Sequence, residues 1–231
     1  MEFHNASFQY LSSVWILSGF KHAGAVMKSP RIPPMLAMIV QAGLMAVDGI
    51  TFSERATCPV CGGPVSGYDT RKKVFAVIRE NDRIRTLSVS VKRFSCRSCG
   101  CIVNADEPFY PGTRIGSPVI DLCLTLATMM PVNRTAAWLD TMDIIVDRTS
   151  CRQYVRNQAR VVPSTDLFGI RMPLSVISLS SLSSRAGQGS AVRGAEILGA
   201  CGFPSTRRAP FDLPSSQERE DRDAEEKEKE R

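Results

Sequence analysis

Two C-x2-C pairs have the residue types and the spacing of a metal site. They are separated by 34 residues, and their members are Cys58, Cys61, Cys96 and Cys99. A zinc ion takes four such thiolates in a tetrahedron, and each C-x2-C turn brings two of them to one side of the ion. The glycines that follow the pairs, Gly62 and Gly100, favour tight turns that point backbone N–H groups at the sulfurs. We therefore expect a Zn²⁺ site.

Four thiolates would complete the coordination shell of zinc, so the expected role of the ion is structural rather than catalytic. Two alternatives stay open, namely iron, as in a rubredoxin-like electron carrier, and a set of thiols that binds no metal. Cys101 lies two residues beyond Cys99, outside the C-x2-C turn, and is interpreted as a spare cysteine. Cys123 lies in an apolar stretch and is interpreted as part of the core.

The residues between the two pairs predict a β-hairpin. Residues 71–78 and 83–94 are rich in β-forming types, and the sequence RENDR between them is typical of a turn. In the second strand, apolar side chains at 87, 89 and 91 alternate with polar ones, which indicates one buried face. Because a lone hairpin is only marginally stable in water, we expect the metal to supply on the order of 10 kcal/mol to this zinc ribbon.

A second candidate site is a basic helix near the middle of the chain. Residues 133–160 have helix-turn-helix proportions, with Asn133 as the expected cap of the first helix and Asp147 as the expected cap of the second. In the second helix an apolar face would dock on the preceding helices, and arginines recur every four residues beside that face. The residues predicted to contact DNA here are Arg148, Thr149, Arg152, Gln153, Arg156 and Arg160.

Positive charge is concentrated in the cysteine-bounded segment. The chain has a net charge of +6, and residues 58–101 alone carry nine basic side chains against three acidic ones. This surplus indicates an anionic partner, and double-stranded DNA is favoured over RNA because no aromatic platform for unstacked bases is visible. The ribbon residues predicted to contact DNA are Arg71, Lys72, Lys73, Lys92 and Arg93. The competing interpretation is a basic surface that binds no ligand.

The order of these segments predicts an α+β fold with flexible termini, in which a small β-hairpin zinc ribbon precedes a three-helix helix-turn-helix domain. Pro- and Gly-rich stretches and changes in composition set the expected boundaries. The segments are 1–57 with one apolar helix at about 35–47, the zinc ribbon at 58–104, a linker at 105–116, the helix-turn-helix at 117–162, and a largely disordered region of low complexity with a charged tail at 163–231. Within this last region one short helix is expected near 191–200.

Composition and motifs narrow the compartment and the class of function. The apolar stretch 35–47 is too short to cross a bilayer, and no signal-peptide pattern is visible, so we expect a reducing, cytoplasmic and nucleoid-associated location without membrane contact. No phosphate-cradling glycine loop and no histidine beside a candidate nucleophile is visible, so we expect neither an enzyme nor a small-molecule substrate. A homodimer on palindromic DNA is one expected arrangement.

Four stretches together resemble a known family: TFSERATCPVCGGPVSGYDTR, VKRFSCRSCG, DEPFYPGTRIGSPVIDLCLTLA and VDRTSCRQYV. They are similar to the amino-terminal region of insertion-sequence transposases and their archaeal relatives, over about residues 51–160. In that group a zinc ribbon followed by a helix-turn-helix grips the ends of the element. The resemblance implies binding of double-stranded DNA, the four cysteines as zinc ligands, and 148–156 as the recognition helix.

One departure from this family bears on catalysis. Such transposases transfer strands with three carboxylates that hold two metal ions on an RNase H-like fold, and that domain should follow the helix-turn-helix. Only about 70 residues follow here, and their acids before the charged tail are Asp166, Glu196 and Asp212. We therefore expect a DNA-binding relative without strand-transfer activity: a stand-alone protein, a truncated remnant or one product of a split reading frame. A transcription regulator and a zinc-clipped protein-interaction adaptor are the alternatives.

Overall fold

A long antiparallel hairpin organises the fold. The structure is a computed structural model, and it describes residues 32–157, 160–186 and 191–205. Strands β2 (Val65–Glu80) and β3 (Arg83–Cys96) are paired along almost their whole length. Asn81 and Asp82 connect them with φ values of 49° and 59°, which is the left-handed geometry of a two-residue hairpin turn. The turn lies within the predicted RENDR sequence.

Strand β3 is the central strand of the sheet. It has β2 on one edge, and on the other edge the short strands β1 (Thr51–Phe52, parallel) and β4 (Ile102–Asn104, antiparallel) pair with successive parts of it. The predicted apolar face of β3 is confirmed, because its members are each at most 1% exposed: Leu87, Val89 and Val91; the alternation is incomplete, because Ser88 is also buried, at 9% exposed.

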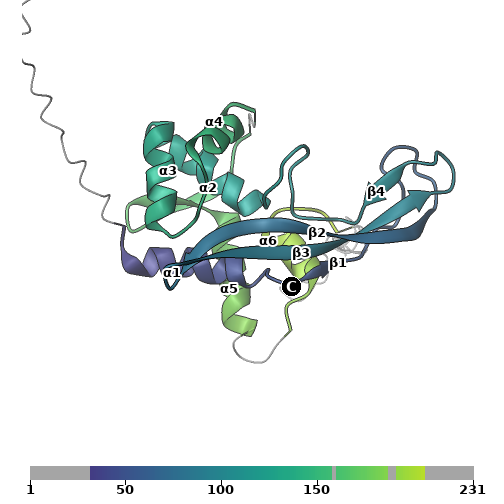
Figure 1. Cartoon of the computed structure of the whole chain (residues 1–231), viewed down its shortest axis with the longest axis horizontal. Helices are drawn as coiled ribbons and strands as arrows, with labels where there is room; N and C mark the ends of the chain where they lie inside the picture. Colours follow the sequence, from purple (N-terminus) through teal and green to yellow (C-terminus); the bar gives the residue numbers. More distant parts are fainter. Residues whose placement is uncertain (1–31, 158–159, 187–190, 206–231) are drawn as a thin grey trace, which may run out of the picture.

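Six helices and a second hairpin complete the described part of the chain. Helices α2, α3 and α4 lie on one side of the long hairpin and α1 and α5 lie on the other, while α6 overlaps the hairpin in this view (Figure 1). The helices are α1 (Pro34–Met45), α2 (Ser117–Ala127), α3 (Val132–Thr141), α4 (Arg148–Asn157), α5 (Leu174–Ala186) and α6 (Gly194–Ala200). The hairpin consists of β5 (Ser164–Leu167) and β6 (Ile170–Pro173). The predicted α+β class is confirmed, and α1 occupies the stretch predicted as an apolar helix.

No helix among the described residues is long and apolar enough to span a lipid bilayer.

The core is continuous across the boundaries drawn from the sequence. One cluster of buried apolar residues joins the sheet to α1, α2, α3, α5 and α6. Helix α2 is at its centre, since every residue from Ser117 to Leu126 is buried, including Cys123, which was predicted as core. The stretch predicted as a linker, 105–116, has no helix or strand, but Phe109 within it packs edge-on against Phe75 with ring centroids 6.0 Å apart.

A β-bulge in β2 brings Phe75 into this core. The pairing skips a residue between Val74 and Ala76, so that two consecutive side chains, Phe75 and Ala76, are both buried. Gly116, just before α2, touches the Phe75 ring, and a Cβ at this position would lie 2.4 Å from a ring carbon. A glycine is therefore required where α2 meets the hairpin.

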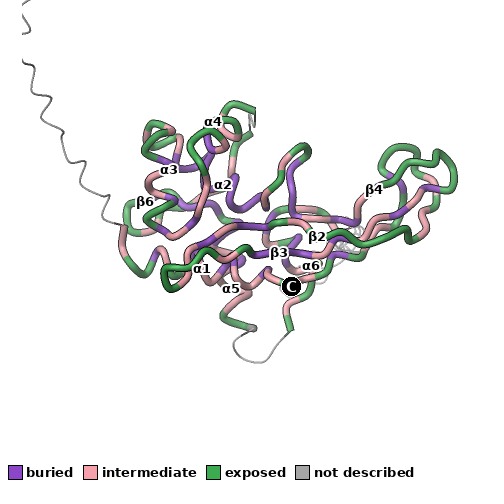
Figure 2. Tube along the Cα trace, viewed as in Figure 1, coloured by how far each residue is buried: buried purple, intermediate pink, exposed green. Residues whose placement is uncertain are grey.

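The cysteine-bearing end of the long hairpin projects away from the helices. Figure 2 shows β2 passing from buried residues in its turn half to exposed residues toward the cysteines, whereas β3 keeps buried residues, Phe94 and Cys96, as far as its cysteine end. The buried cluster therefore runs along β3 to Cys96, while the helices lie beside the turn half of the hairpin (Figure 1).

The prediction that 163–231 is largely disordered is wrong for the parts of it that the structure describes. Residues 164–186 and 191–205 contain β5, β6, α5 and α6, and α5 packs along α1. Of these elements only α6 matches an expectation, the short helix near 191–200. Serines conceal the helical signal of α5, whose apolar members Val176 and Leu179 are fully buried. Residues 1–31 and 206–231, predicted as flexible termini, lie outside the described residues.

A single glycine sets the separation of α1 and α5. A Cβ at Gly43 would lie 3.0 Å from the backbone nitrogen of Ser180 and 3.0 Å from the carbonyl oxygen of Val176, and backbone atoms cannot turn aside. We expect Gly43→Ala to lower the free energy of unfolding by about 1–3 kcal/mol, although alanine favours an isolated helix. Urea titration followed by circular dichroism would measure this. Met38→Ala on the exposed face of α1 is the control, with an expected change within about 0.5 kcal/mol.

Candidate metal centre and basic surface

The four cysteines of the two C-x2-C pairs meet at the projecting end of the hairpin. Their Sγ atoms all lie within 4.8 Å of one another. The distance between the Sγ atoms of Cys58 and Cys99 is 3.7 Å, and that between Cys61 and Cys96 is 3.4 Å. A tetrahedron with metal–sulfur bonds of about 2.3 Å separates its sulfurs by about 3.8 Å, so the thiols have the spacing that a metal ion requires. The cluster could hold a metal ion.

The two C-x2-C turns repeat the same backbone geometry. Gly62 donates its N–H to the carbonyl oxygen of Cys58 at 2.9 Å, and Gly100 donates to Cys96 in the same way at 3.0 Å. Both glycines have a φ of +71°, where a side chain would be strained. This repetition gives each turn the same shape, with its two sulfurs on the side that faces the other turn.

The repeated geometry explains Cys101, which sits at the position that Gly63 occupies in the first turn. Cys58 donates its N–H to the carbonyl oxygen of Gly63 at 3.0 Å, and Cys96 donates to that of Cys101 at 2.9 Å. Cys101 closes the second turn through its backbone, its side chain is exposed, and it is not part of the four-sulfur cluster.

Gly63 is required for a different reason. A Cβ there would lie 2.3 Å from the hydroxyl oxygen of Ser98 in the opposing turn. The first turn therefore needs a glycine where the second tolerates a cysteine.

The electrostatics of the cluster favour a cation. N–H groups of Cys99 and Ser98 lower the pKa of Cys96 to about 6, although burial opposes them. The Gly63 N–H also lowers the pKa of Cys61, but its thiol neighbours, beginning with Cys96, outweigh this and raise it to about 12. One thiolate forms readily and further ones are costly, because like charges at this distance repel. A bound metal ion would remove that cost.

Helix α4 holds three of the predicted arginines on one face. Arg148, Arg152 and Arg156 are all exposed, as are Thr149 and Gln153 beside them. The adjacent face is fixed by Cys151, which is fully buried and whose thiol raises the pKa of Cys123 on α2.

The two helix caps predicted for this region have different outcomes. Asp147 accepts a hydrogen bond from the Ser150 N–H at 2.8 Å, which confirms its predicted role as the cap of α4. Asn133 is not a cap, since α3 begins at Val132 after Pro131, and its side chain instead accepts a hydrogen bond from Arg152 at 3.3 Å.

Arg160 does not extend the arginine face of α4. The helix ends at Asn157, and the guanidinium of Arg160 lies 4.0 Å from the ring centroid of Tyr110. The prediction placed it one more helical turn along the same stripe. The structure places it instead against a buried network in which Tyr110 and Ser175 both donate hydrogen bonds to Asp121, at 2.6 and 2.8 Å. This network was not predicted, because Ser175 lies 54 residues from Asp121 and no local pattern links them.

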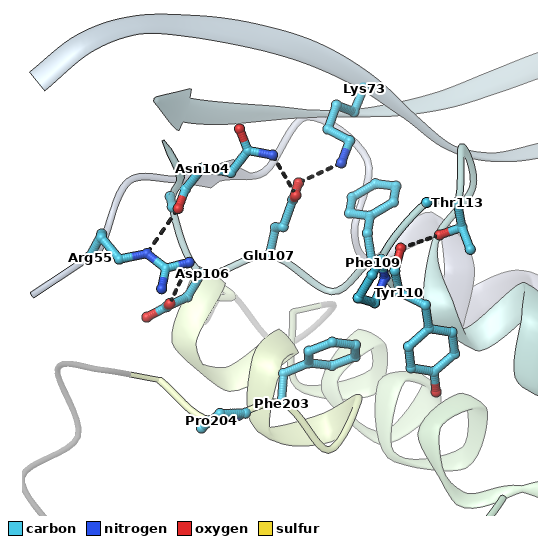
Figure 3. Close-up of a pocket in the computed structure, with 13 residues that line it drawn as sticks. Arg55, Lys73, Asn104, Asp106, Glu107, Phe109, Tyr110, Thr113, Phe203 and Pro204 are labelled. Carbon is cyan, nitrogen blue, oxygen red and sulfur yellow. Dashed lines mark hydrogen bonds and ion pairs between the residues drawn. The ribbon is translucent and has the colours of Figure 1, made fainter. Parts of the chain in front are cut away.

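The cations predicted on the ribbon divide into paired and unpaired ones. Arg93 donates to Asp69 on the neighbouring strand at 2.6 Å, and Lys73 donates to Glu107 at 2.7 Å while lying 3.9 Å from the Phe109 ring centroid. Figure 3 shows Lys73, Glu107 and Asn104 converging at the rim of a cavity. These two cations are therefore committed to intramolecular contacts.

The remaining ribbon cations keep their charge available. Arg71 and Lys72 are exposed, and Lys92 lies 5.4 Å from the Phe94 ring centroid. Arg134 on α3 was not predicted, but it is exposed beside Asn133, and among the described residues it has no ion-pair partner. Its position at the start of the predicted helix-turn-helix could have identified Arg134 as a candidate DNA contact.

Comparison with protein-family models, with curated proteins and with solved structures found no match for this chain.

Proposed function

We propose that this protein binds double-stranded DNA through α4, with a zinc-clamped ribbon as a second basic contact. The observation that carries the proposal is the arginine face of α4. Along Arg148–Asn157 there is no acidic residue, and neither Arg148 nor Arg156 has an ion-pair partner among the described residues. Surface helices that are merely solvated usually intersperse acids that pair with their arginines.

The geometry of α4 suits a groove. Successive arginines four residues apart differ by about 40° around the helix axis, so the three span about 80° of one face. Thr149 and Gln153 continue this face with short polar side chains of the kind that contact base edges, and the arginines would contact phosphates or guanines. The cationic face and the anchoring Cys151 point in different directions, so DNA contact would not disturb the core.

The packing of α2, α3 and α4 supports the helix-turn-helix interpretation. The three helices contact one another, and residues 142–147 connect α3 to α4. In this arrangement α4 is the recognition helix and α3 crosses behind it. Arg134 and the Arg152–Asn133 hydrogen bond place further polar groups at the start of α3, beside the basic face. The likeness to the DNA-gripping region of insertion-sequence transposases agrees with this proposal.

Zinc is the metal that fits the cluster best. Four thiolates in a tetrahedron satisfy zinc completely and leave no open position for a substrate, so the ion would act as a clamp. The residues that would hold it are Cys58, Cys61, Cys96 and Cys99. The clamp would fix the exposed ends of β2 and β3, where Arg71, Lys72 and Lys92 are carried. Iron is the alternative that a metal analysis would reveal.

The proposal assigns no strand transfer to the described residues. Among them, the cluster able to hold a metal consists of thiols, whereas strand transfer on the RNase H-like fold uses carboxylates with open metal positions. We therefore propose a binding role at DNA ends or operators. A regulator would protect a symmetric, promoter-like site as a dimer, and a footprint on genomic DNA distinguishes this from protection of element termini.

The first test is the salt dependence of DNA binding. Fluorescence anisotropy with a labelled duplex of about 30 base pairs would give the association constant between about 50 and 200 mM salt. We expect the plot of log K against log salt to fall with a slope of about −3.6 to −5.4, as for four to six contacted phosphates. A flat plot, or no binding at the lowest salt, would remove DNA as the partner and favour the adaptor function.

A further inference from the structure

A cavity next to the end of α2 has the groups of an anion site. It has a volume of about 240 Å³, and its lining combines hydroxyls and two arginines from separate elements. The polar residues that line it are Thr125, Thr128, Arg160, Ser164 and Arg171. We propose that this cavity binds a small oxyanion of the phosphate or sulfate class, a function that does not depend on DNA recognition by α4.

The hydroxyl of Thr125 is the strongest indication of a ligand. Thr125 is 2% exposed, and its Oγ1 atom is buried without a hydrogen-bond partner. Leaving a buried hydroxyl unsatisfied is unfavourable, and a helical threonine normally avoids it by bonding to the carbonyl four residues before it. Thr125 is one of the residues that line the cavity, so an oxyanion bound there would be next to the residue whose hydroxyl lacks an acceptor.

Two guanidinium groups supply the charge. Arg160 reaches the cavity from the segment after α4, and Arg171 reaches it from β6. Arginine matches the planar arrangement of two oxygens on a phosphate or sulfate, so two arginines can hold one anion from two sides. Thr128 has already donated its hydroxyl proton to the carbonyl of Thr125 at 2.7 Å, so it offers only an acceptor, which suits a protonated phosphate oxygen.

The intramolecular contacts of Arg160 and Arg171 are too weak to neutralise their positive charges. Asp166 Oδ1 lies 3.7 Å from Arg171 Nε, but both side chains are at least half exposed, and exposed pairs of this kind are weak. Arg160 stacks on Tyr110 and lies near the buried Asp121, whose oxygens already accept hydrogen bonds from Tyr110 and Ser175. The volume accommodates the head of a phosphate monoester and leaves the rest of the ligand outside.

The test uses inorganic phosphate as the probe on the full chain. Differential scanning fluorimetry, with sodium chloride added to hold ionic strength constant, should show a rise in Tm with phosphate, and calorimetry should show saturable binding. Thr125→Val keeps the shape and removes only the hydroxyl. We expect this variant to be at least as stable as the natural chain without phosphate, yet to bind phosphate at least tenfold more weakly.

Thr135→Val is the matched control, because the Thr135 hydroxyl is also buried without a partner but lies outside the cavity lining. It should keep the full response to phosphate, whereas Arg160→Gln and Arg171→Gln should lose it. The proposal is overturned if phosphate raises the Tm no more than chloride does, or if Thr125→Val binds phosphate as well as Thr135→Val. Should Thr125→Val fail to fold, the two arginine variants decide the question alone.

The natural occupant could be a phosphate of the DNA backbone or a free anion in solution, and a competition experiment distinguishes the two. If saturating duplex DNA displaces phosphate, the natural occupant is a phosphate of the DNA backbone. If phosphate binds equally well in the presence of DNA, the occupant is a free anion. Both outcomes support an oxyanion site. Failure of this proposal can be distinguished from failure of DNA binding in the salt test, because Arg160 and Thr125 lie off the face of α4.

Discussion

Cys96→Ser is expected to reduce bound zinc from about one ion per chain to below about 0.1, without unfolding the helices. Cys96 is the thiol whose pKa is lowered to about 6, and serine cannot supply a comparable anion at neutral pH. Loss of one ligand leaves three thiolates with an open position, and the affinity that remains should not survive a chelator. Metal analysis by mass spectrometry after dialysis against a chelator would measure the loss.

The expected damage is local because of where the core lies. Phe75, Ile78 and Leu87 are fully buried in the turn half of the hairpin, beside the helices, whereas at the other end Cys61 and Cys99 are exposed and only Cys58 and Cys96 are buried. We therefore expect hydrogen exchange to accelerate in 58–70 and 93–104 while α2 stays protected. This differs from small zinc-finger domains, which unfold as a whole when the metal is removed.

Cys101→Ser is the matched control for this experiment. It removes a neighbouring thiol whose backbone closes the second turn, and its side chain is outside the cluster, so zinc content should not change. Equal loss of zinc from both variants would show that Cys101 takes part in binding. Retention of zinc by Cys96→Ser would contradict the four-thiolate site.

The double variant Arg148→Gln/Arg156→Gln is expected to weaken DNA binding at least about 30-fold, as for about 1 kcal/mol or more from each contact. If both arginines contact phosphates, the magnitude of the salt slope should also fall by about 2, because two fewer counterions are released. Both residues are exposed on α4 and lack ion-pair partners among the described residues, so their replacement should leave stability nearly unchanged. Anisotropy titration at several salt concentrations would measure both effects.

A control with the same loss of charge separates a specific face from general attraction. Arg185→Gln/Arg193→Gln also removes two positive charges, one from the end of α5, which lies across the long hairpin from α4 (Figure 1), and one from the start of α6. This variant should lose less than about threefold in affinity at 150 mM salt, since distant charges are screened. Equal losses in the two variants would point to binding by net charge alone and would remove α4 as the recognition element.

Features with a local signal could be predicted from the sequence. The cysteine cluster follows from spacing, because each C-x2-C turn is complete in itself and its glycine supplies the required backbone geometry. The hairpin follows from alternation in β3 and from the turn at Asn81 and Asp82. The start of α4 follows from Asp147, whose side chain caps the helix within one turn.

Features that depend on tertiary contacts could not be predicted. Lys73 and Arg93 were interpreted as DNA contacts, since the sequence does not reveal that Glu107 and Asp69 lie opposite them. The strand register that pairs Asp69 with Arg93 follows a bulge at Tyr68, which has no clear signature. Arg160 fitted the periodicity of α4, but the helix ends before it.

Helix α5 is the clearest case of a missed element. Its serine content suggested disorder, yet those serines satisfy their own hydroxyls locally, as when Ser180 and Ser181 donate to the carbonyl of Ile177. Its buried residues, Val176 and Leu179, recur at a helical interval, and this interval was the signal that composition concealed.

The pairing of α1 with α5 has a consequence for how the chain is made. On the ribosome α1 emerges more than 120 residues before α5 does. The apolar side chains of Leu36, Val40 and Leu44 therefore lack their packing partner, α5, through most of synthesis. Contacts between such remote segments slow folding, because a large loop must close before they form. We expect the nascent polypeptide to need chaperone protection until α5 leaves the exit tunnel, and translation stopped before Leu174 to yield an aggregation-prone product.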